Sequence, residues 1–262
     1  MNMIHMLGIL AIVFFSALAL MCYFREKLKN PIFNPLMIIS CGICFFCWNY
    51  AAYEQGWLKD GFMTLENISP FICTVILLTP LMSKKIKELA YSAIAFLGCG
   101  MFLALFLSPI ASFLNNHAHT ASFMHISEAS CHLVMALYGF YLFLSGKVKI
   151  GYRSLSRAAL FVYSVVIFGV LLNYFFHVDN FGMNMHGSYS IYWLDIFRSF
   201  EVTLLAYLVG IFGTLLLGFG TGIFLDRISR HKINHESTHT PAEATEDSAT
   251  ESTTPADVIN QL

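Results

Sequence analysis

Two histidines and a glutamate recur at helical spacing where one apolar stretch begins. His125, Glu128 and His132 occupy positions i, i+3 and i+7 of the stretch FMHISEASCHLVMALYGFYLF. On a helix these positions share one face. Glu128 precedes His132 by one turn, and a carboxylate at that distance can orient an imidazole. One interpretation is that His132 is a general base, oriented by Glu128, which activates a nucleophile. The other is that His125 and Glu128 are interfacial and only His132 is buried against a neighbouring helix.

The same side chains are metal ligands by type. His125 and His132 would lie about 10 Å apart along a helix axis, which is too far for both to bind one ion, whereas Glu128 could share an ion with either. The enzyme hypothesis therefore includes no metal and no cofactor. The alternative is a transport or binding protein for a metal or small solute that uses His125, Glu128, His132, His177 and His186.

The apolar composition predicts which elements carry these residues. Of 262 residues, 57% are hydrophobic and 12% charged, and the charged fraction is about half of that in a typical soluble domain. We expect an all-α polytopic membrane protein with seven transmembrane helices, because seven apolar runs approach the length needed to cross a bilayer. They cover residues 4–24, 35–53, 68–83, 88–114, 123–145, 156–177 and 200–225. Its expected partners are membrane lipids and not nucleic acid.

Basic residues predict the orientation. Thirteen of the 15 Lys and Arg residues follow the first, third, fifth and seventh runs, and only Lys59 and Arg198 lie elsewhere. Because positively charged connections stay in the cytoplasm, we expect a multi-pass protein of the cell membrane with its N-terminus outside. Residues 1–232 would form the transmembrane domain. Residues 233–262 are acidic and rich in Ser and Thr, which predicts a disordered cytoplasmic tail.

With this orientation, polar residues gather near the outer ends of the predicted helices. Ionisable groups within a bilayer are costly and usually mark a cavity, so we expect an outward-facing polar cavity. It would be lined by the runs 68–83, 123–145 and 156–177 and by the connection 178–199. In this cavity Cys73 would be the nucleophile that His132 activates. Asn173 would form a polar wall or donate a hydrogen bond to an oxyanion.

Cysteine and glycine spacing has a simpler explanation in helix packing. Cys41, Cys44 and Cys47 lie at i, i+3 and i+6 of one apolar run, which favours a packing stripe because no fourth ligand for an iron–sulfur cluster is nearby. Gly218 and Gly222 form a small-xxx-small pair, which predicts close helix contact. All seven cysteines lie in apolar runs, a distribution that does not indicate a disulfide framework.

Three stretches together resemble the YwaF-type family of integral membrane proteins. PFICTVILLTPLM (Pro70–Met82) resembles the family's Pro-Φ-His-Leu-Cys segment, and EASCHLVMALYGFYL (Glu128–Leu142) resembles its Phe-Phe-x-x-His segment. The region Leu171–Phe197 resembles its Asn-Tyr, Asn-Tyr-x-Φ-x and Leu-Asp-Φ-Φ string, with matches at Asn173, Asn180 and Asp195.

The family is related to a mammalian transmembrane acyltransferase of ether-phospholipid metabolism, to which a cysteine nucleophile is attributed. The resemblance implies that Cys73 is the nucleophile and His132 the matching histidine. We therefore expect a lipid-active enzyme, a cysteine-dependent phospholipid acyltransferase or acyl hydrolase, with Glu128 and Asn173 in supporting roles. A structural membrane partner without chemistry is a third interpretation.

Overall fold

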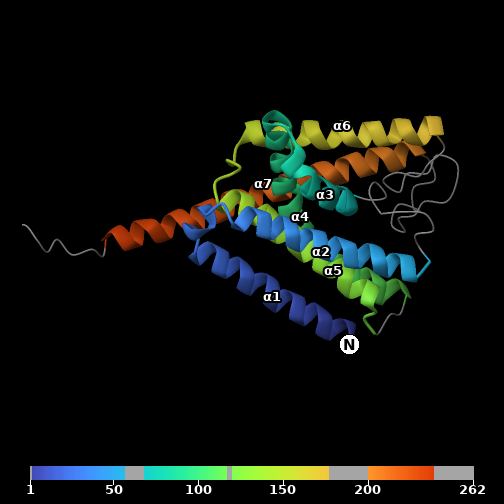
Figure 1. The fold of residues 1–262 in the computed structure, drawn as a ribbon, viewed down its shortest axis with the longest axis horizontal. Helices are drawn as coiled ribbons and strands as arrows, with labels where there is room; N and C mark the ends of the chain where they lie inside the picture. The colour runs from blue at the N-terminus through green and yellow to red at the C-terminus, as the bar shows by residue number, and fades with distance from the viewer. Residues whose placement is uncertain (1, 57–67, 117–119, 177–199, 239–262) are drawn as a thin grey trace, which may run out of the picture.

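The computed structural model describes residues 2–56, 68–116, 120–176 and 200–238, and this part of the chain is almost entirely helical (Figure 1). The helices are α1 (Met3–Tyr23), α2 (Phe33–Glu54), α3 (Ile68–Leu78), α4 (Lys84–Asn116), α5 (Phe123–Leu144), α6 (Tyr152–Phe176) and α7 (Phe200–Thr238). Short 3₁₀ turns cover Lys27–Lys29 and Thr79–Leu81. The prediction of an all-α fold is confirmed for the described residues.

Within the described residues, six helices are long and apolar enough to cross a membrane. They are α1, α2, α5, α6, the Lys84–Leu107 part of α4 and the Leu204–Arg227 part of α7. Their outward faces are apolar as well, since Ile12, Phe46 and Phe168 are 69%, 63% and 57% exposed. Large exposed apolar faces of this kind indicate contact with lipid or with another apolar surface. The architecture is that of a multi-pass membrane protein.

Helix α3 is the exception in length. It has 11 residues, which corresponds to about 16 Å, roughly half of the ~30 Å hydrocarbon core. The 3₁₀ turn at Thr79–Leu81 adds one turn at its end. A seventh membrane-spanning segment therefore stays a prediction. Helix α3 packs against α2, α4 and α5.

Helix α4 occupies the centre of the bundle and contacts α1, α3, α5, α6 and α7 (Figure 1). Glycines allow the closest approaches. A Cβ atom on Gly139 of α5 would lie 2.6 Å from the backbone nitrogen of Cys99 on α4, and one on Gly218 of α7 would overlap the backbone carbonyl group of Phe96. A Cβ on Gly222 would lie 3.3 Å from the Phe143 ring. The predicted close packing of Gly218 and Gly222 is confirmed.

The connections with basic residues meet at one end of the bundle (Figure 1). There, Arg25 donates a 3.2 Å hydrogen bond to the Leu144 carbonyl group and lies 3.8 Å from the Asp226 carboxylate. Arg157 and Glu88 form a second ion pair at 3.4 Å. These contacts join the predicted cytoplasmic ends of α1, α4, α5, α6 and α7. The side of the membrane that this end faces stays a prediction.

The boundary of the expected tail falls inside a helix. Helix α7 continues to Thr238, so it includes the first residues of the segment 233–262. The rest of that segment lies outside the described residues.

We predict that Gly218→Ala lowers the stability of the bundle, because the new methyl group must push α7 away from the α4 backbone. Overpacking of this kind costs about 1–3 kcal/mol. The matched control is Gly220→Ala on the same helix, where a Cβ would meet nothing within 4 Å. Thermal unfolding midpoints of the purified proteins in detergent test this prediction. Equal midpoints for the two variants would contradict the close approach.

Candidate functional site

A buried hydrogen bond joins the first turn of α3 to the middle of α5. His132 is the tenth of the 22 residues of α5, and its Nε2 atom lies 2.9 Å from the Ser69 hydroxyl oxygen. The two residues are 3% and 8% exposed. The imidazole also packs against Trp48 of α2, with ring centroids 5.6 Å apart. We call these two residues the Ser69–His132 pair.

The second nitrogen of the ring has no hydrogen-bond partner among the described residues. The His132 Nδ1 atom is buried and unpaired, so Glu128 does not orient the ring through a hydrogen bond. Glu128 lies one turn earlier on α5 and is half-buried. The ring is instead held by Ser69 and by its contact with Trp48.

Cys73, the predicted nucleophile, lies one turn beyond Ser69 on α3. It is 0% exposed, and its Sγ atom lies 3.3 Å from the Sγ atom of Cys131, which directly precedes His132. Within the described residues, no hydrogen bond joins Cys73 to His132. The structure thus brings both predicted residues to the interface of α3 and α5, but the His132 ring bonds to Ser69.

Asn173 lies on α6 and is 1% exposed. The Phe71 ring of α3 stacks on Phe161 of α6 with ring centroids 6.2 Å apart, and Asn173 follows Phe161 by twelve residues, about 18 Å further along the helix. The role of Asn173 as a polar wall or oxyanion donor stays a prediction.

The residues of the metal hypothesis do not assemble in the described part of the chain. His125 caps its own helix, because its Nδ1 atom accepts from the Ser122 backbone at 3.2 Å and lies 2.8 Å from the Ser122 hydroxyl group. His177 and His186 lie outside the described residues, as do Asn180 and Asp195. Among the residues described, no group of three or more His, Cys, Asp or Glu side chains could hold a metal ion.

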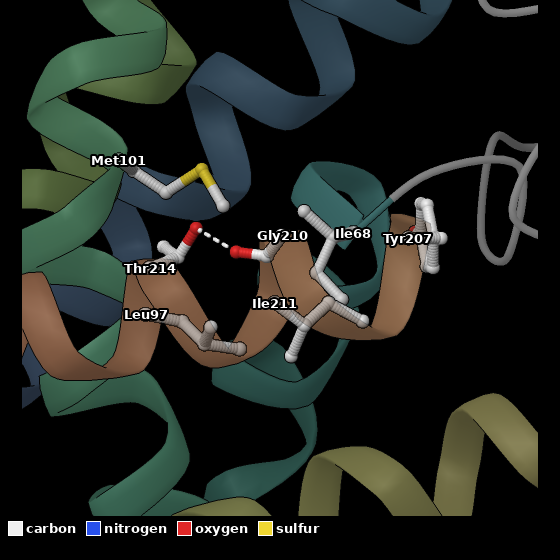
Figure 2. Close-up of a pocket in the computed structure, with 7 residues that line it drawn as sticks. All are labelled: Ile68, Leu97, Met101, Tyr207, Gly210, Ile211 and Thr214. Carbon is white, nitrogen blue, oxygen red and sulfur yellow. Dashed lines mark hydrogen bonds between the residues drawn. The ribbon is translucent and has the colours of Figure 1, made fainter. Parts of the chain in front are cut away.

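An apolar pocket lies between α3, α4 and α7 (Figure 2), and its wall includes Ile68, the residue before Ser69. Its volume is about 230 Å³, and Ile68, Leu97, Met101, Tyr207, Gly210, Ile211 and Thr214 line it. The Thr214 hydroxyl group donates to the Gly210 carbonyl group of its own helix at 2.9 Å, so this polar group is internally satisfied. Met101 connects the pocket to the pair, because its sulfur lies 3.6 Å from the Ser69 hydroxyl oxygen.

This pocket differs from the cavity that the sequence predicts. The predicted cavity is polar and includes α5 and α6, whereas the pocket is apolar and includes α4 and α7. Ser69 is the residue that sequence reasoning missed. The available signal was the i, i+4 spacing of Ser69 and Cys73, which places a hydroxyl group on the same helix face as the predicted nucleophile.

Fold and site together define a helical membrane protein with a buried serine–histidine pair beside an apolar pocket. Comparisons with protein-family models, with curated proteins and with solved structures find no match for this chain. The resemblance to the YwaF-type family therefore stays a prediction.

We predict that Ser69 and His132 are energetically coupled. In a double-mutant cycle of Ser69→Ala and His132→Leu, the free energies of unfolding should deviate from additivity by about 0.5–2 kcal/mol. Reversible unfolding in mixed detergent micelles provides the measurement.

The control cycle combines His132→Leu with Ser92→Ala. Ser92 is also buried, at 3% exposure, but its hydroxyl group donates only within α4, to the Glu88 carbonyl group at 2.9 Å. This second cycle should be additive. Additivity in both cycles would contradict a hydrogen bond between Ser69 and His132.

Proposed function

We propose that this protein is a membrane-embedded enzyme that acts on acyl esters of membrane lipids, by acyl transfer or by hydrolysis. The observation that carries the proposal is the buried 2.9 Å hydrogen bond between Ser69 and His132 next to an apolar pocket. A hydroxyl group becomes a useful nucleophile when an adjacent base accepts its proton, and the required separation is about 2.6–3.2 Å.

The reaction would proceed in two halves. In the first, the Ser69 oxygen attacks the ester carbonyl carbon while its proton passes to Nε2 of His132, and the same proton then protonates the departing alcohol. In the second half, an acceptor alcohol or water attacks the acyl-serine and passes its proton to Nε2. Ser69 regains a proton when the acyl group leaves.

The apolar lining of the pocket supports a fatty acyl chain as the group that binds there. Ile68, which directly precedes Ser69, contributes to its wall, and Met101 contacts both the pocket and the Ser69 hydroxyl group. Binding pockets that take apolar ligands are lined mainly by apolar side chains with few polar groups. We place the protein in the cell membrane with its N-terminus outside, on the distribution of its basic residues.

Cys73 remains the nucleophile that the family resemblance implies, and it lies one turn from Ser69. The proposal favours Ser69 because the His132 ring bonds to its hydroxyl group. Transport or binding of a metal or solute is the other function that the sequence left open. Within the described residues, no observation favours it.

We predict that Ser69→Ala and His132→Ala each lower acyl release or acyl transfer by about 10²–10⁴-fold, the range of a lost general base. Cys73→Ala should retain most of the activity. The measurement uses purified protein in vesicles that contain a phospholipid with a labelled acyl chain, and follows the label into free fatty acid and new lipid.

Ser92→Ala is the matched control for removing a buried hydroxyl group, and it should leave the rate unchanged. Gel filtration of each variant establishes that it is folded. If Ser69→Ala keeps wild-type activity and Cys73→Ala loses its activity, the nucleophile is Cys73 and not Ser69. Absence of acyl chemistry in wild type with any phospholipid class would reject the proposal.

A further inference from the structure

Three thiols from three helices meet one turn away from the Ser69–His132 pair. Cys73 of α3 and Cys131 of α5 have their sulfur atoms 3.3 Å apart. Cys41 of α2 lies close enough to interact with the Cys73 thiol. All three residues are 0% exposed, and all seven cysteines of the chain are free thiols in the structure.

We propose that Cys73 and Cys131 are a redox-active dithiol that closes a disulfide bond between α3 and α5. A disulfide bond is 2.03–2.05 Å long, so the two sulfur atoms need to approach by only about 1.2 Å from their 3.3 Å contact. The acyl chemistry proposed for Ser69 uses neither thiol, and this inference does not depend on it.

The position of the dithiol indicates the class of oxidant. Both sulfur atoms are enclosed by helices, so a water-soluble oxidant has no route to them except through the apolar interior. Cys44 of α2, which is half-buried, lies near Cys131. We therefore assign a lipid-soluble quinone as the oxidant.

The reaction balances as a two-electron transfer. The S–H bonds of Cys73 and Cys131 break and one S–S bond forms. The two electrons and two protons pass to the quinone, which becomes a hydroquinone. The disulfide ties α3 to α5 one turn from Ser69, so oxidation would lock the short helix against its neighbour.

The test uses the full-length protein in sealed vesicles and the quinone decylubiquinone as the oxidant. After oxidation the protein is denatured, its free thiols are alkylated, and its intact mass is measured. Wild type should change from seven alkylatable thiols to five, and digestion should yield a peptide in which Cys73 is linked to Cys131. The thermal unfolding midpoint of the oxidised protein should rise.

Two variants and a second oxidant make the test decisive. Cys99→Ala removes another thiol that is 0% exposed, and the linked Cys73–Cys131 peptide should still form. In Cys131→Ala, neither the linked peptide nor the rise of the thermal unfolding midpoint should be seen. If Cys131→Ala does not fold, Cys73→Ala replaces it, and the same two losses are expected. Ferricyanide, which does not enter bilayers, should leave all seven thiols of the wild type free.

Three results would overturn the inference. Seven alkylatable thiols in wild type after quinone treatment would reject a redox-active dithiol. A peptide linking Cys73 to Cys41 would reject Cys131 as the partner. Oxidation by ferricyanide as fast as by the quinone would reject the lipid-soluble oxidant.

Discussion

The hydrogen bond between the Ser69 hydroxyl group and the His132 imidazole determines how α3 sits in the bundle. In an apolar interior, an unpaired polar side chain costs about 1–3 kcal/mol by protein mutational data, so the contact stabilises both residues. Helix α3 is too short to be positioned by its length across the bilayer. Its first turn is instead held by this polar contact, and its next turn by the contact of Cys73 with Cys131.

Glycines determine how closely the helices around the Ser69–His132 contact approach one another. Gly139 lets α5 approach the α4 backbone, and Gly218 does the same for α7. Such close approaches favour tight packing of helices in lipid, where burial of apolar surface supplies little driving force. Further along the same two helices, α4 and α7 leave the apolar pocket next to Ile68 of α3. The Ser69 hydroxyl group and the apolar pocket thus lie close together because Ile68, at the start of α3, lines the pocket between α4 and α7.

The helices were predictable from the sequence because the thickness of the bilayer sets the number of consecutive apolar residues that a membrane-spanning helix needs. The predicted run 35–53 is α2, Phe33–Glu54, and the run 123–145 is α5, Phe123–Leu144. The convergence of Cys73 and His132 on one interface followed from their expected depth. That expectation placed His132 in the first half of its helix, and His132 is the tenth of the 22 residues of α5.

The partner of His132 could not be predicted in the same way. Which residue of α3 faces it depends on the rotation and register of two helices, whose facing residues Ser69 and His132 are 63 positions apart in the chain. No pattern within one helix encodes these quantities. The same limit applies to Asn173, because its position relative to α3 depends on how α6 packs in the bundle. The pocket was also beyond sequence reasoning, because a cavity is a property of packing between helices and not of any single one.

The most direct test of the reactive role of Ser69 is covalent labelling with a lipid-linked fluorophosphonate, which reacts with activated serine hydroxyl groups. The account predicts that mass spectrometry of the labelled wild-type protein finds the adduct on Ser69, and that His132→Ala loses it. Labelling of Cys73, or no adduct at Ser69 in folded wild-type protein, would contradict the account.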